Sequence, residues 1–289
     1  MENLSPYTQV IQQVYPDLAI NAVDAISHGR NNTVLDVNDQ FIFRFPKYIE
    51  GLHALKQEIT LLKYIQGRIS LATPEPEFIC LADLSGAFMG YPKIPGEPLW
   101  NNLLSNASST TQGNLAKQLG EFLSTLHRLS SITELATCLP RNDTASQWTE
   151  IFRRIRTKLI PHMRPDAQTW IISHFERFLN EPKHFAYKPV LKHGDFGTSN
   201  ILFDQTTNSI SGIIDFSNAS LGDPAYDFAG LLSSYGENFV YQASCGYPNF
   251  EDLWPRIRFY KSTFALLEAL FGIENSDMLA YESGMANYM

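Results

Sequence analysis

The segment HGDFGTSN occupies residues 193–200, and the apolar run ILF follows it at 201–203. A second acidic motif, IIDF, occupies residues 213–216. Short apolar runs bounded by polar turns predict buried strands. The two acidic segments are therefore expected to be held rigidly by short strands and to face one cleft.

Three polar residues in these segments have the spacing of a phosphoryl-transfer site. Asp195 stands five residues before Asn200, and Asp215 follows in the second motif. A kinase catalytic loop places its base Asp five residues before a magnesium-binding Asn, with a second magnesium-binding Asp further on. Carboxylate and amide oxygens suit Mg²⁺, which neutralises phosphate charge. The spacing predicts Asp195 as the catalytic base and Asn200 and Asp215 as metal ligands, whereas His193 is expected to brace the loop.

Length and composition describe a globular chain. Its 289 residues are 44% hydrophobic and 18% charged, which suits two lobes around a shared cleft. The N-terminal residues lack the pattern of a secretory signal, and no apolar run is long enough to span a membrane. The three cysteines are far apart, which favours reduced, mostly buried thiols. We therefore expect a cytoplasmic protein with no membrane partner, and a monomer by default.

The acidic residues are concentrated in the C-terminal part. Residues 196–289 contain 11 acidic and three basic side chains, and this part carries the whole net charge of −8. An acidic surface argues against a nucleic-acid partner. It would attract a small cationic substrate, although acidic residues also serve simply as a solvated surface.

Local patterns divide the chain into two lobes. Residues 1–91 contain short strands and a helix at 51–66, which predicts an antiparallel sheet with one helix. The proline-rich segment 92–98 (PKIPGEP) is expected to be a hinge, because prolines cannot continue a helix or the interior of a sheet. Residues 99–289 show mainly helical patterns. We predict an α+β, two-lobed, protein-kinase-like fold with a larger, mostly helical C-terminal lobe.

The N-terminal lobe offers a clamp for nucleotide phosphates. Kinases pair a lysine on the third strand with a helix glutamate. Glu58 is suitably placed in the helix, but the residue at the strand position is Arg44, with Lys47 just beyond it as a rival. Arginine pairs bidentately with carboxylates and phosphates and stays charged. We expect Arg44 and Glu58 to form this clamp, an ordinary surface ion pair being the alternative.

Two further segments are expected to contact the nucleotide, either ATP or GTP. A small polar turn that includes Ser27 and Asn32 would place backbone N–H groups near the phosphates. The base would bond to the backbone around Tyr91, Lys93 and Ile94, and the bulky Tyr91 side chain would either bias the choice of base or belong to the core.

These segments resemble the aminoglycoside phosphotransferases and their choline, homoserine and macrolide kinase relatives. HGDFGTSNILF is similar to the family's catalytic loop, and SGIIDFSNASLGDPAYDFAGLL to its metal-binding strand and following helix. FRFPK, IPGEPL and YKSTFALLEALFGI resemble the branch that modifies the 2″-hydroxyl. The resemblance implies a kinase that moves the γ-phosphate of ATP or GTP, with Mg²⁺, to an aminoglycoside hydroxyl, here the 2″-hydroxyl, giving antibiotic resistance.

The acceptor is expected between the catalytic loop and the C-terminal helices. Only a short turn separates Asp215 from Gly222, so the docking platform that a protein kinase offers to a peptide is missing. Carboxylates and aromatic rings suit a polyamine sugar. The candidates on these helices are Glu237, Glu251, Asp252, Trp254, Tyr260 and Glu268. The alternatives are a kinase of a homoserine- or choline-like amino alcohol, and a kinase-fold nucleotide-binding protein without turnover.

Overall fold

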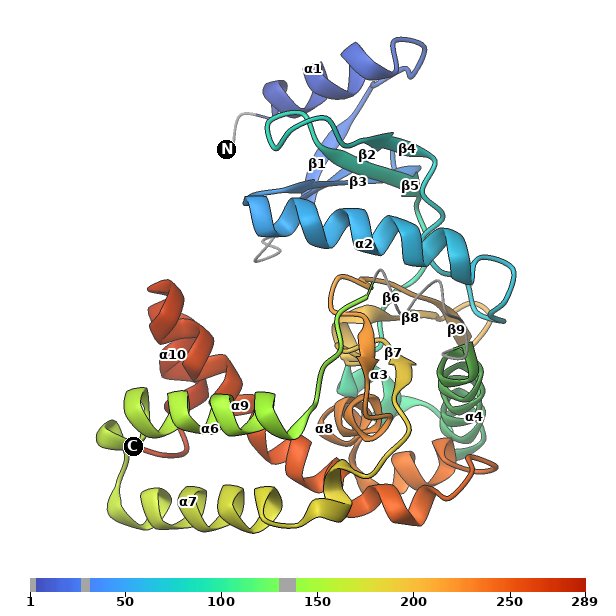
Figure 1. Cartoon of the computed structure of the whole chain (residues 1–289). Coiled ribbons are helices and arrows are strands. Elements are labelled where there is room, and N and C mark those ends of the chain that lie inside the picture. The colour runs from blue at the N-terminus through green and yellow to red at the C-terminus, as the bar shows by residue number, and fades with distance from the viewer. Residues whose placement is uncertain (1–3, 27–31, 130–138) are drawn as a thin grey trace.

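The computed structural model describes residues 4–26, 32–129 and 139–289. Its N-terminal part is a five-stranded antiparallel sheet in the order β1-β2-β3-β5-β4. In Figure 1 helix α1 lies on one side of this sheet and α2 on the other, between the sheet and the C-terminal part. The elements are α1 (Ser5–Val14), β1 (Val23–Ile26), β2 (Asn32–Val37), β3 (Phe41–Pro46), α2 (Ile49–Ile65), β4 (Phe78–Cys80) and β5 (Phe88–Pro92).

The alternation of side chains along β3 determines which residues face the cleft. Successive residues of a strand point to opposite faces of the sheet. Phe43 and Phe45 belong to the core cluster that also contains Ile11 of α1, whereas Ile42 belongs to the cluster shared with α2. Arg44 is in phase with Ile42, so its side chain is directed toward α2.

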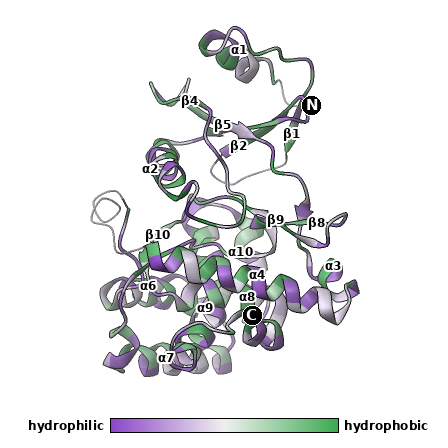
Figure 2. Ribbon diagram, turned by 90° about the vertical axis from the view of Figure 1, so that its right-hand side faces the viewer, coloured by the Kyte–Doolittle hydropathy of each residue, from purple (hydrophilic) through white to green (hydrophobic). Residues whose placement is uncertain are grey.

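The C-terminal part is mostly helical, with two small sheets. In Figure 2 the ribbon of α4 alternates between hydrophilic and hydrophobic residues, as expected for a helix with one buried face. The elements are β6 (Glu97–Pro98), α3 (Asn101–Asn106), α4 (Ser109–Arg128), α6 (Ala145–Lys158), α7 (Pro165–Leu179), β7 (Val190–Lys192), β8 (Ile201–Asp204), β9 (Ser209–Ile213), β10 (Ser220–Gly222), α8 (Ala225–Ala243), α9 (Trp254–Asn275) and α10 (Met278–Met285).

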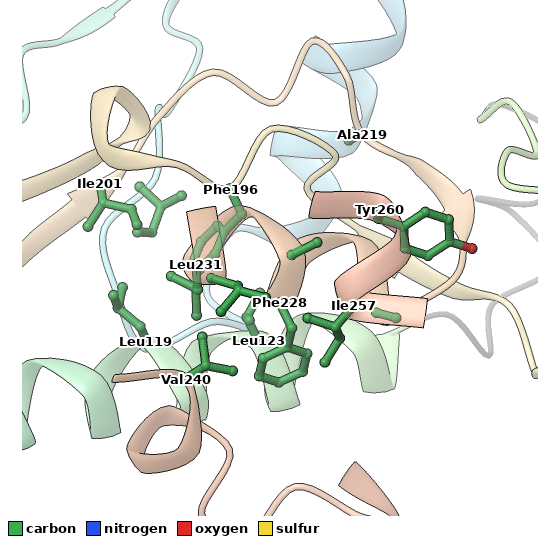
Figure 3. Packing of buried hydrophobic residues seen from close by; sticks show 14 of the residues in the cluster. Leu119, Leu123, Phe196, Ile201, Ala219, Phe228, Leu231, Val240, Ile257 and Tyr260 are labelled. Carbon is green, nitrogen blue, oxygen red and sulfur yellow. The ribbon is translucent and has the colours of Figure 1, made fainter. Parts of the chain in front are cut away.

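The core of the C-terminal part lies directly beneath the catalytic loop. Phe196 of that loop is buried and stacks on Phe122 of α4, with ring centroids 5.5 Å apart and planes 2° from parallel. Figure 3 shows Phe196 among side chains of α4, α8 and α9, including Leu123 and Phe228. A loop anchored by a buried aromatic ring in this way is positioned by the core itself.

Two connections join the N- and C-terminal parts. The predicted hinge enters the C-terminal sheet, because its last residues form β6, which pairs with β8. Prolines are tolerated there because β6 is an edge strand. The second connection follows α2, where the carbonyl of Ala72 accepts a hydrogen bond of 2.9 Å from the N–H of Ile213.

Two of the three cysteines, Cys80 and Cys245, lie within the described residues. Cys80 and Cys245 are free; Cys80 is half-buried and Cys245 is exposed, so the expectation of mostly buried thiols is wrong for Cys245. Cys138 lies outside the described residues.

Among the helices that the structure describes, none combines the length and the apolar character needed to cross a bilayer.

Candidate active site

The catalytic loop lies between β7 and β8 and holds Asp195 and Asn200 together. The Asn200 amide Nδ2 donates to the Asp195 carboxylate Oδ2 and to the Asp195 carbonyl, both at 2.9 Å. The loop needs glycine at Gly194, where φ is +81° and a Cβ atom would lie 2.2 Å from the carbonyl oxygen of Asn218. This close approach brings the segment after Asp215 against the catalytic loop.

His193 braces the loop, as the sequence analysis expected. Its Nε2 lies 3.0 Å from the carbonyl oxygen of Ile214, and its Nδ1 lies 3.2 Å from the backbone N–H of Asp195. The first contact requires a protonated Nε2 and the second an unprotonated Nδ1, which is the neutral imidazole. Both ring nitrogens are thus engaged in holding the two acidic motifs together.

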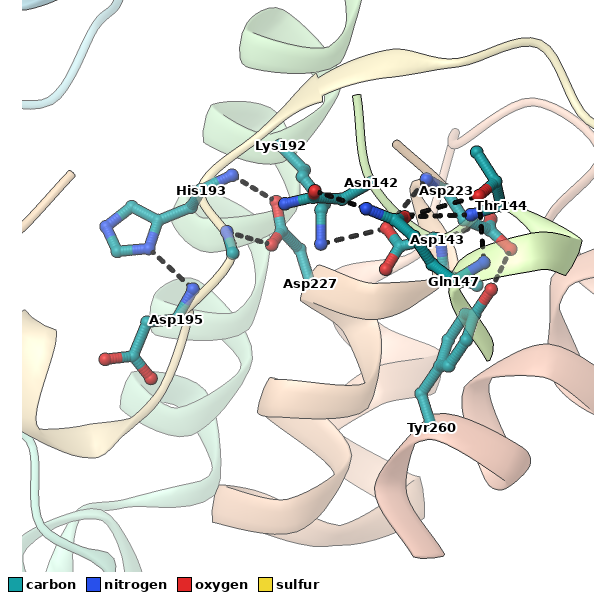
Figure 4. A network of polar contacts seen from close by, with 12 residues as sticks. Asn142, Asp143, Thr144, Gln147, Lys192, His193, Asp195, Asp223, Asp227 and Tyr260 are labelled. Atoms are coloured by element: carbon teal, nitrogen blue, oxygen red, sulfur yellow. Dashed lines mark hydrogen bonds and ion pairs between the residues drawn. The ribbon is translucent and has the colours of Figure 1, made fainter. Parts of the chain in front are cut away.

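Asp227 of α8 supports the same loop from below. Its carboxylate accepts the backbone N–H groups of His193 and Gly194 at 2.8 and 2.9 Å, and His127 of α4 lies 3.2 Å from it. Burial acts to raise the pKa of Asp227, but the hydrogen bonds from His127 and the backbone outweigh it and lower the pKa. Asp227 is therefore an ionised anchor for the loop. Figure 4 shows this anchor beside Asp195.

The environment of Asp195 suits a group that accepts a proton. Burial raises the pKa of its carboxyl above the ordinary value, and the nearby Asp215 carboxylate adds to the rise. A higher pKa makes the carboxylate a stronger base.

Arg44 joins Asp215 to Glu58. One guanidinium nitrogen lies 2.6 Å from the Glu58 carboxylate and the other 2.9 Å from the Asp215 carboxylate. The predicted pair between Arg44 and Glu58 is present and buried rather than exposed at the surface. Asp215 has a φ of +61°, which is uncommon outside glycine. Its Oδ1 also accepts from the Ser217 hydroxyl at 2.7 Å, and these contacts hold the strained residue in place.

The oxygens at this place fit Mg²⁺ bound mainly through phosphates. No group of three or more His, Cys, Asp or Glu side chains that could hold a metal occurs within residues 4–26, 32–129 and 139–289. Asn200 uses its amide nitrogen for Asp195, which leaves the amide oxygen for a cation. The contacts of Asp215 with Arg44 and Ser217 engage Oδ1, which leaves Oδ2 for a cation. One amide and one carboxylate oxygen match the few protein ligands that Mg²⁺ takes beside nucleotide phosphates.

The other predicted nucleotide residues occupy different environments. Ser27 lies outside the described residues. Asn32 begins β2. The Tyr91 side chain belongs to the core, being only 4% exposed. Lys93 uses its side chain on Asp36 and Asp39.

The backbone of the hinge leaves one donor for a base. The N–H of Lys93 already donates to the carbonyl of Gln40 at 2.7 Å, so it is not available. The N–H of Ile94 makes no hydrogen bond within the part of the chain that the structure describes. The N–H of Tyr91 belongs to strand β5, which pairs with β3. Of the three residues predicted to bond to the base, Ile94 is therefore the one that presents a donor.

A cleft of about 1330 Å³ opens beside Asp195. It is walled by α6, α8 and α9 and includes Trp100, whose side chain is 48% exposed. Of the predicted acceptor residues, Glu268 lines this cleft. The two cations in the wall are already paired: Lys192 Nζ lies 2.9 Å from Asp143, and Arg154 Nε lies 2.9 Å from Glu274.

The remaining predicted acceptor residues lie elsewhere. Glu237 forms an ion pair with Arg258. Trp254 is buried in the core, and neither Glu251 nor Asp252 lines the cleft. Tyr260 is fully buried and donates its hydroxyl proton to Asp223 at 2.9 Å. These residues flank the core at the base of α8 and α9 instead of facing an acceptor.

A buried polar network beneath the cleft was missed by sequence reasoning. Asp223 accepts from the backbone N–H of Ala225 at the start of α8, and it also binds Arg256 at 2.6 Å. Its backbone N–H donates to Asp143, the partner of Lys192, as Figure 4 shows. The one feature of the sequence that could have indicated this network is the position of Lys192, a cation directly before the catalytic loop.

Comparison with known proteins places this geometry among phosphotransferases. The model described as the phosphotransferase enzyme family matches residues 22–260. The viomycin phosphotransferase of Streptomyces vinaceus is 28% identical over 224 residues, which cover 75% of this chain and 71% of that protein.

Solved structures share the fold over nearly the whole chain. The GDP and kanamycin complex of APH(2″)-IIIa has a TM-score of 0.90 at 26% identity and covers 98% of this chain and 97% of its own. The macrolide 2′-phosphotransferase type I has a TM-score of 0.77 at 18% identity, with 99% and 98% covered. At 18% identity, the similarity to the macrolide phosphotransferase shows the fold alone. The fold therefore does not indicate whether an aminoglycoside or a macrolide is the acceptor.

Proposed function

This chain belongs to the phosphotransferase enzyme family, and we propose on that basis that it transfers the γ-phosphate of ATP or GTP to an aminoglycoside hydroxyl. The observation that carries the proposal is the contact between the two acidic motifs at a cleft of about 1330 Å³. Asn200 bonds to Asp195, which lines the cleft. The backbone N–H of Ile214 donates to the carbonyl of Asn200 at 2.9 Å, which brings the neighbouring Asp215 to the same place. A kinase of this type needs those three groups and room for an acceptor.

The charge of the cleft supports a cationic acceptor. Lys192 and Arg154, which line the cleft, are each paired with a carboxylate, and the carboxylate of Asp195 also lines it. Ammonium groups would form charge-assisted hydrogen bonds there. The exposed ring of Trp100 offers a surface on which a sugar ring can stack. An aminoglycoside, modified at the 2″-hydroxyl as the sequence resemblance implies, meets these requirements.

The chain's own residues account for acceptor activation. The Asp195 carboxylate orients the acceptor hydroxyl and takes its proton as the oxygen attacks the γ-phosphorus and the bond to the nucleoside diphosphate breaks. Asn200 keeps that carboxylate in place through its amide N–H. Asn200 and Asp215 would hold Mg²⁺, which supplies positive charge against the phosphates. Arg44 would add a fixed positive charge beside them.

The first test is acceptor-dependent release of nucleoside diphosphate. The purified protein is assayed with ATP and with GTP against kanamycin, gentamicin, viomycin, a macrolide, homoserine and choline. Release with kanamycin or gentamicin supports the proposal and identifies the nucleotide. Release only with homoserine or choline would keep the kinase chemistry and discard the acceptor class, and nucleotide binding without any release would favour a binding protein.

The residue-level test is Asp195→Asn. This change removes the proton acceptor but keeps the size of the side chain, so we expect turnover to fall at least about 10²-fold, the contribution typical of a general base. GDP binding, measured by calorimetry, should stay within about twofold. Glu176→Gln on the exposed face of α7 is the control and should behave as wild type. Normal turnover in Asp195→Asn would contradict the proposed mechanism.

A further inference from the structure

Resting on the proposed function, we infer that a second chamber beside the cleft binds an ammonium-bearing part of the acceptor remote from the reacting hydroxyl. This α2 chamber has a volume of about 760 Å³. It lies between the start of α2 and the turn from α9 to α10, which are on the same side of the molecule in Figure 1. The residues used below to define it are Asn32, Tyr48, Glu50, Glu58, Asn275 and Asp277.

The chamber is contiguous with the acceptor cleft. Asn218 and Phe271 line both cavities. Asn218 also packs against the catalytic loop, since its carbonyl oxygen occupies the space that a Cβ at Gly194 would take. A molecule whose hydroxyl lies at Asp195 is therefore next to the entrance of the chamber. A multi-ring acceptor would extend through it.

The charge of the chamber has one sign. Glu50, Glu58 and Asp277 line it, and the described lining residues include no lysine, arginine or histidine. Concave acidic surfaces raise the local concentration of cations. Glu58 belongs both to the chamber and to the phosphate clamp, where it is paired with Arg44. The negative charge that a ligand would meet in the chamber therefore comes mainly from Glu50 and Asp277.

Two buried oxygens in the chamber lack partners. Glu58 is only 2% exposed; its Oε1 binds Arg44 and the N–H of Phe216, while its Oε2 has no hydrogen-bond partner among the described residues. The Oδ1 atom of Asn32 is likewise buried without a partner in that part of the chain. An unsatisfied buried polar atom destabilises the folded state until a ligand supplies the missing hydrogen bond. Both atoms are acceptors, so the complementary ligand is a hydrogen-bond donor such as an ammonium group.

These features point to a polyamine with several rings. A single-ring amino alcohol would fill the cleft at Asp195 without reaching α2. The N-terminal part of the chain would then contribute to acceptor binding as well as to nucleotide binding. The chamber thereby selects for the size and charge of the acceptor.

The test is the double variant Glu50→Gln/Asp277→Asn. Asparagine keeps the capping contact of Asp277 with the N–H of Ala280, and glutamine keeps the length of Glu50. The control, Glu176→Gln/Glu282→Gln, removes the same charge from exposed positions that line neither cavity. Kanamycin and GDP binding are measured by calorimetry, and kanamycin phosphorylation by kcat and KM.

We expect kanamycin to bind about tenfold more weakly to the chamber variant, in line with the loss of charged hydrogen bonds. GDP affinity and kcat should stay within about twofold, and the control should match wild type. Unchanged kanamycin affinity in the chamber variant overturns the inference, and so does an equal loss in the control. Failure of the wild type to phosphorylate any acceptor contradicts the proposed function before a variant is made, and the chamber proposal falls with it.

Discussion

At the scale of single residues, the guanidinium of Arg44 contacts two carboxylates at once, which the single ammonium group of a lysine would not do. The fork reaches Glu58 with one nitrogen and Asp215 with the other, at 2.6 and 2.9 Å. Burial acts to lower the pKa of Arg44, but the two carboxylates outweigh it and raise the pKa, so the guanidinium stays charged. The same pair of contacts holds Asp215 in its left-handed conformation. Arg44 is thus a positioning residue for Asp215 as well as a source of charge.

We predict that Arg44→Lys impairs this arrangement although the charge is kept. One ammonium cannot match the two-nitrogen fork, and a buried carboxylate left without its partner costs about 1–3 kcal/mol. Turnover should fall about 10-fold or more, and the Tm should fall by about 2–4 °C for each kcal/mol, as measured by calorimetry.

The matched control for Arg44→Lys is Lys56→Arg at an exposed position of α2, which should change neither quantity. If Arg44→Lys kept both the Tm and the turnover of wild type, the positioning role would be refuted, and Lys47 would become the stronger candidate for the phosphate contact.

At the scale of elements, the cleft depends on close packing between helices. Gly120 of α4 lies against α8, where a Cβ atom would stand only 1.8 Å from the carbonyl oxygen of Ala243. Asp227, which holds the catalytic loop, lies in the same element but on the other side of a break in the helix at Gly236, where φ is +81°. The conformational freedom of glycine is not needed at Gly120; what matters there is the missing side chain.

We predict that Gly120→Ala lowers the free energy of unfolding by about 1–3 kcal/mol through overpacking. Gly113→Ala in the same helix is the control, because its Cβ would have only an ordinary contact of 3.5 Å, with Gln242. That variant should be neutral or more stable by up to about 1 kcal/mol from helix propensity. Urea denaturation measures both, and equal effects of the two substitutions would exclude packing as the cause.

At the scale of the whole molecule, Gly212 lies where the N- and C-terminal parts meet. A Cβ there would stand 2.7 Å from the Ile94 side chain and 2.9 Å from the carbonyl oxygen of Ala72. Ile94 belongs to the hinge and presents its N–H to the proposed nucleotide site, and Ala72 forms the second connection between the two parts. The contact thus couples the relative placement of the two parts to the hinge.

We predict that Gly212→Ala weakens GDP binding about 3- to 10-fold and lowers the Tm, because the hinge must move away from the added methyl group. Gly86→Ala is the comparison, since its Cβ would meet only an ordinary contact of 3.8 Å. The GDP affinity is measured by calorimetric titration. Equal affinities in Gly212→Ala and wild type would show that the junction tolerates the methyl group, and would refute the coupling between the placement of the two parts and the hinge.

The sequence by itself determined what depends on neighbours along the chain. The order Asp195, Asn200 and Asp215 follows from loop spacing. The pair of Arg44 with Glu58 was expected because kinases pair a residue at this strand position with a helix glutamate, and the structure contains the pair. The α+β kinase-like fold was predicted from the same local patterns, because binary patterning and proline placement act over a few residues. The functional roles of these residues stay predictions.

Only the tertiary structure decided which distant residues line the cleft. Glu268 lines the cleft whereas Glu237 pairs with Arg258 outside it, although both are carboxylates on C-terminal helices. The choice depends on how α6, α8 and α9 pack, and that packing is a sum of contacts between residues far apart in the chain. Side-chain periodicity identifies the buried face of a helix, but it does not say which partner covers that face or where a cavity is left.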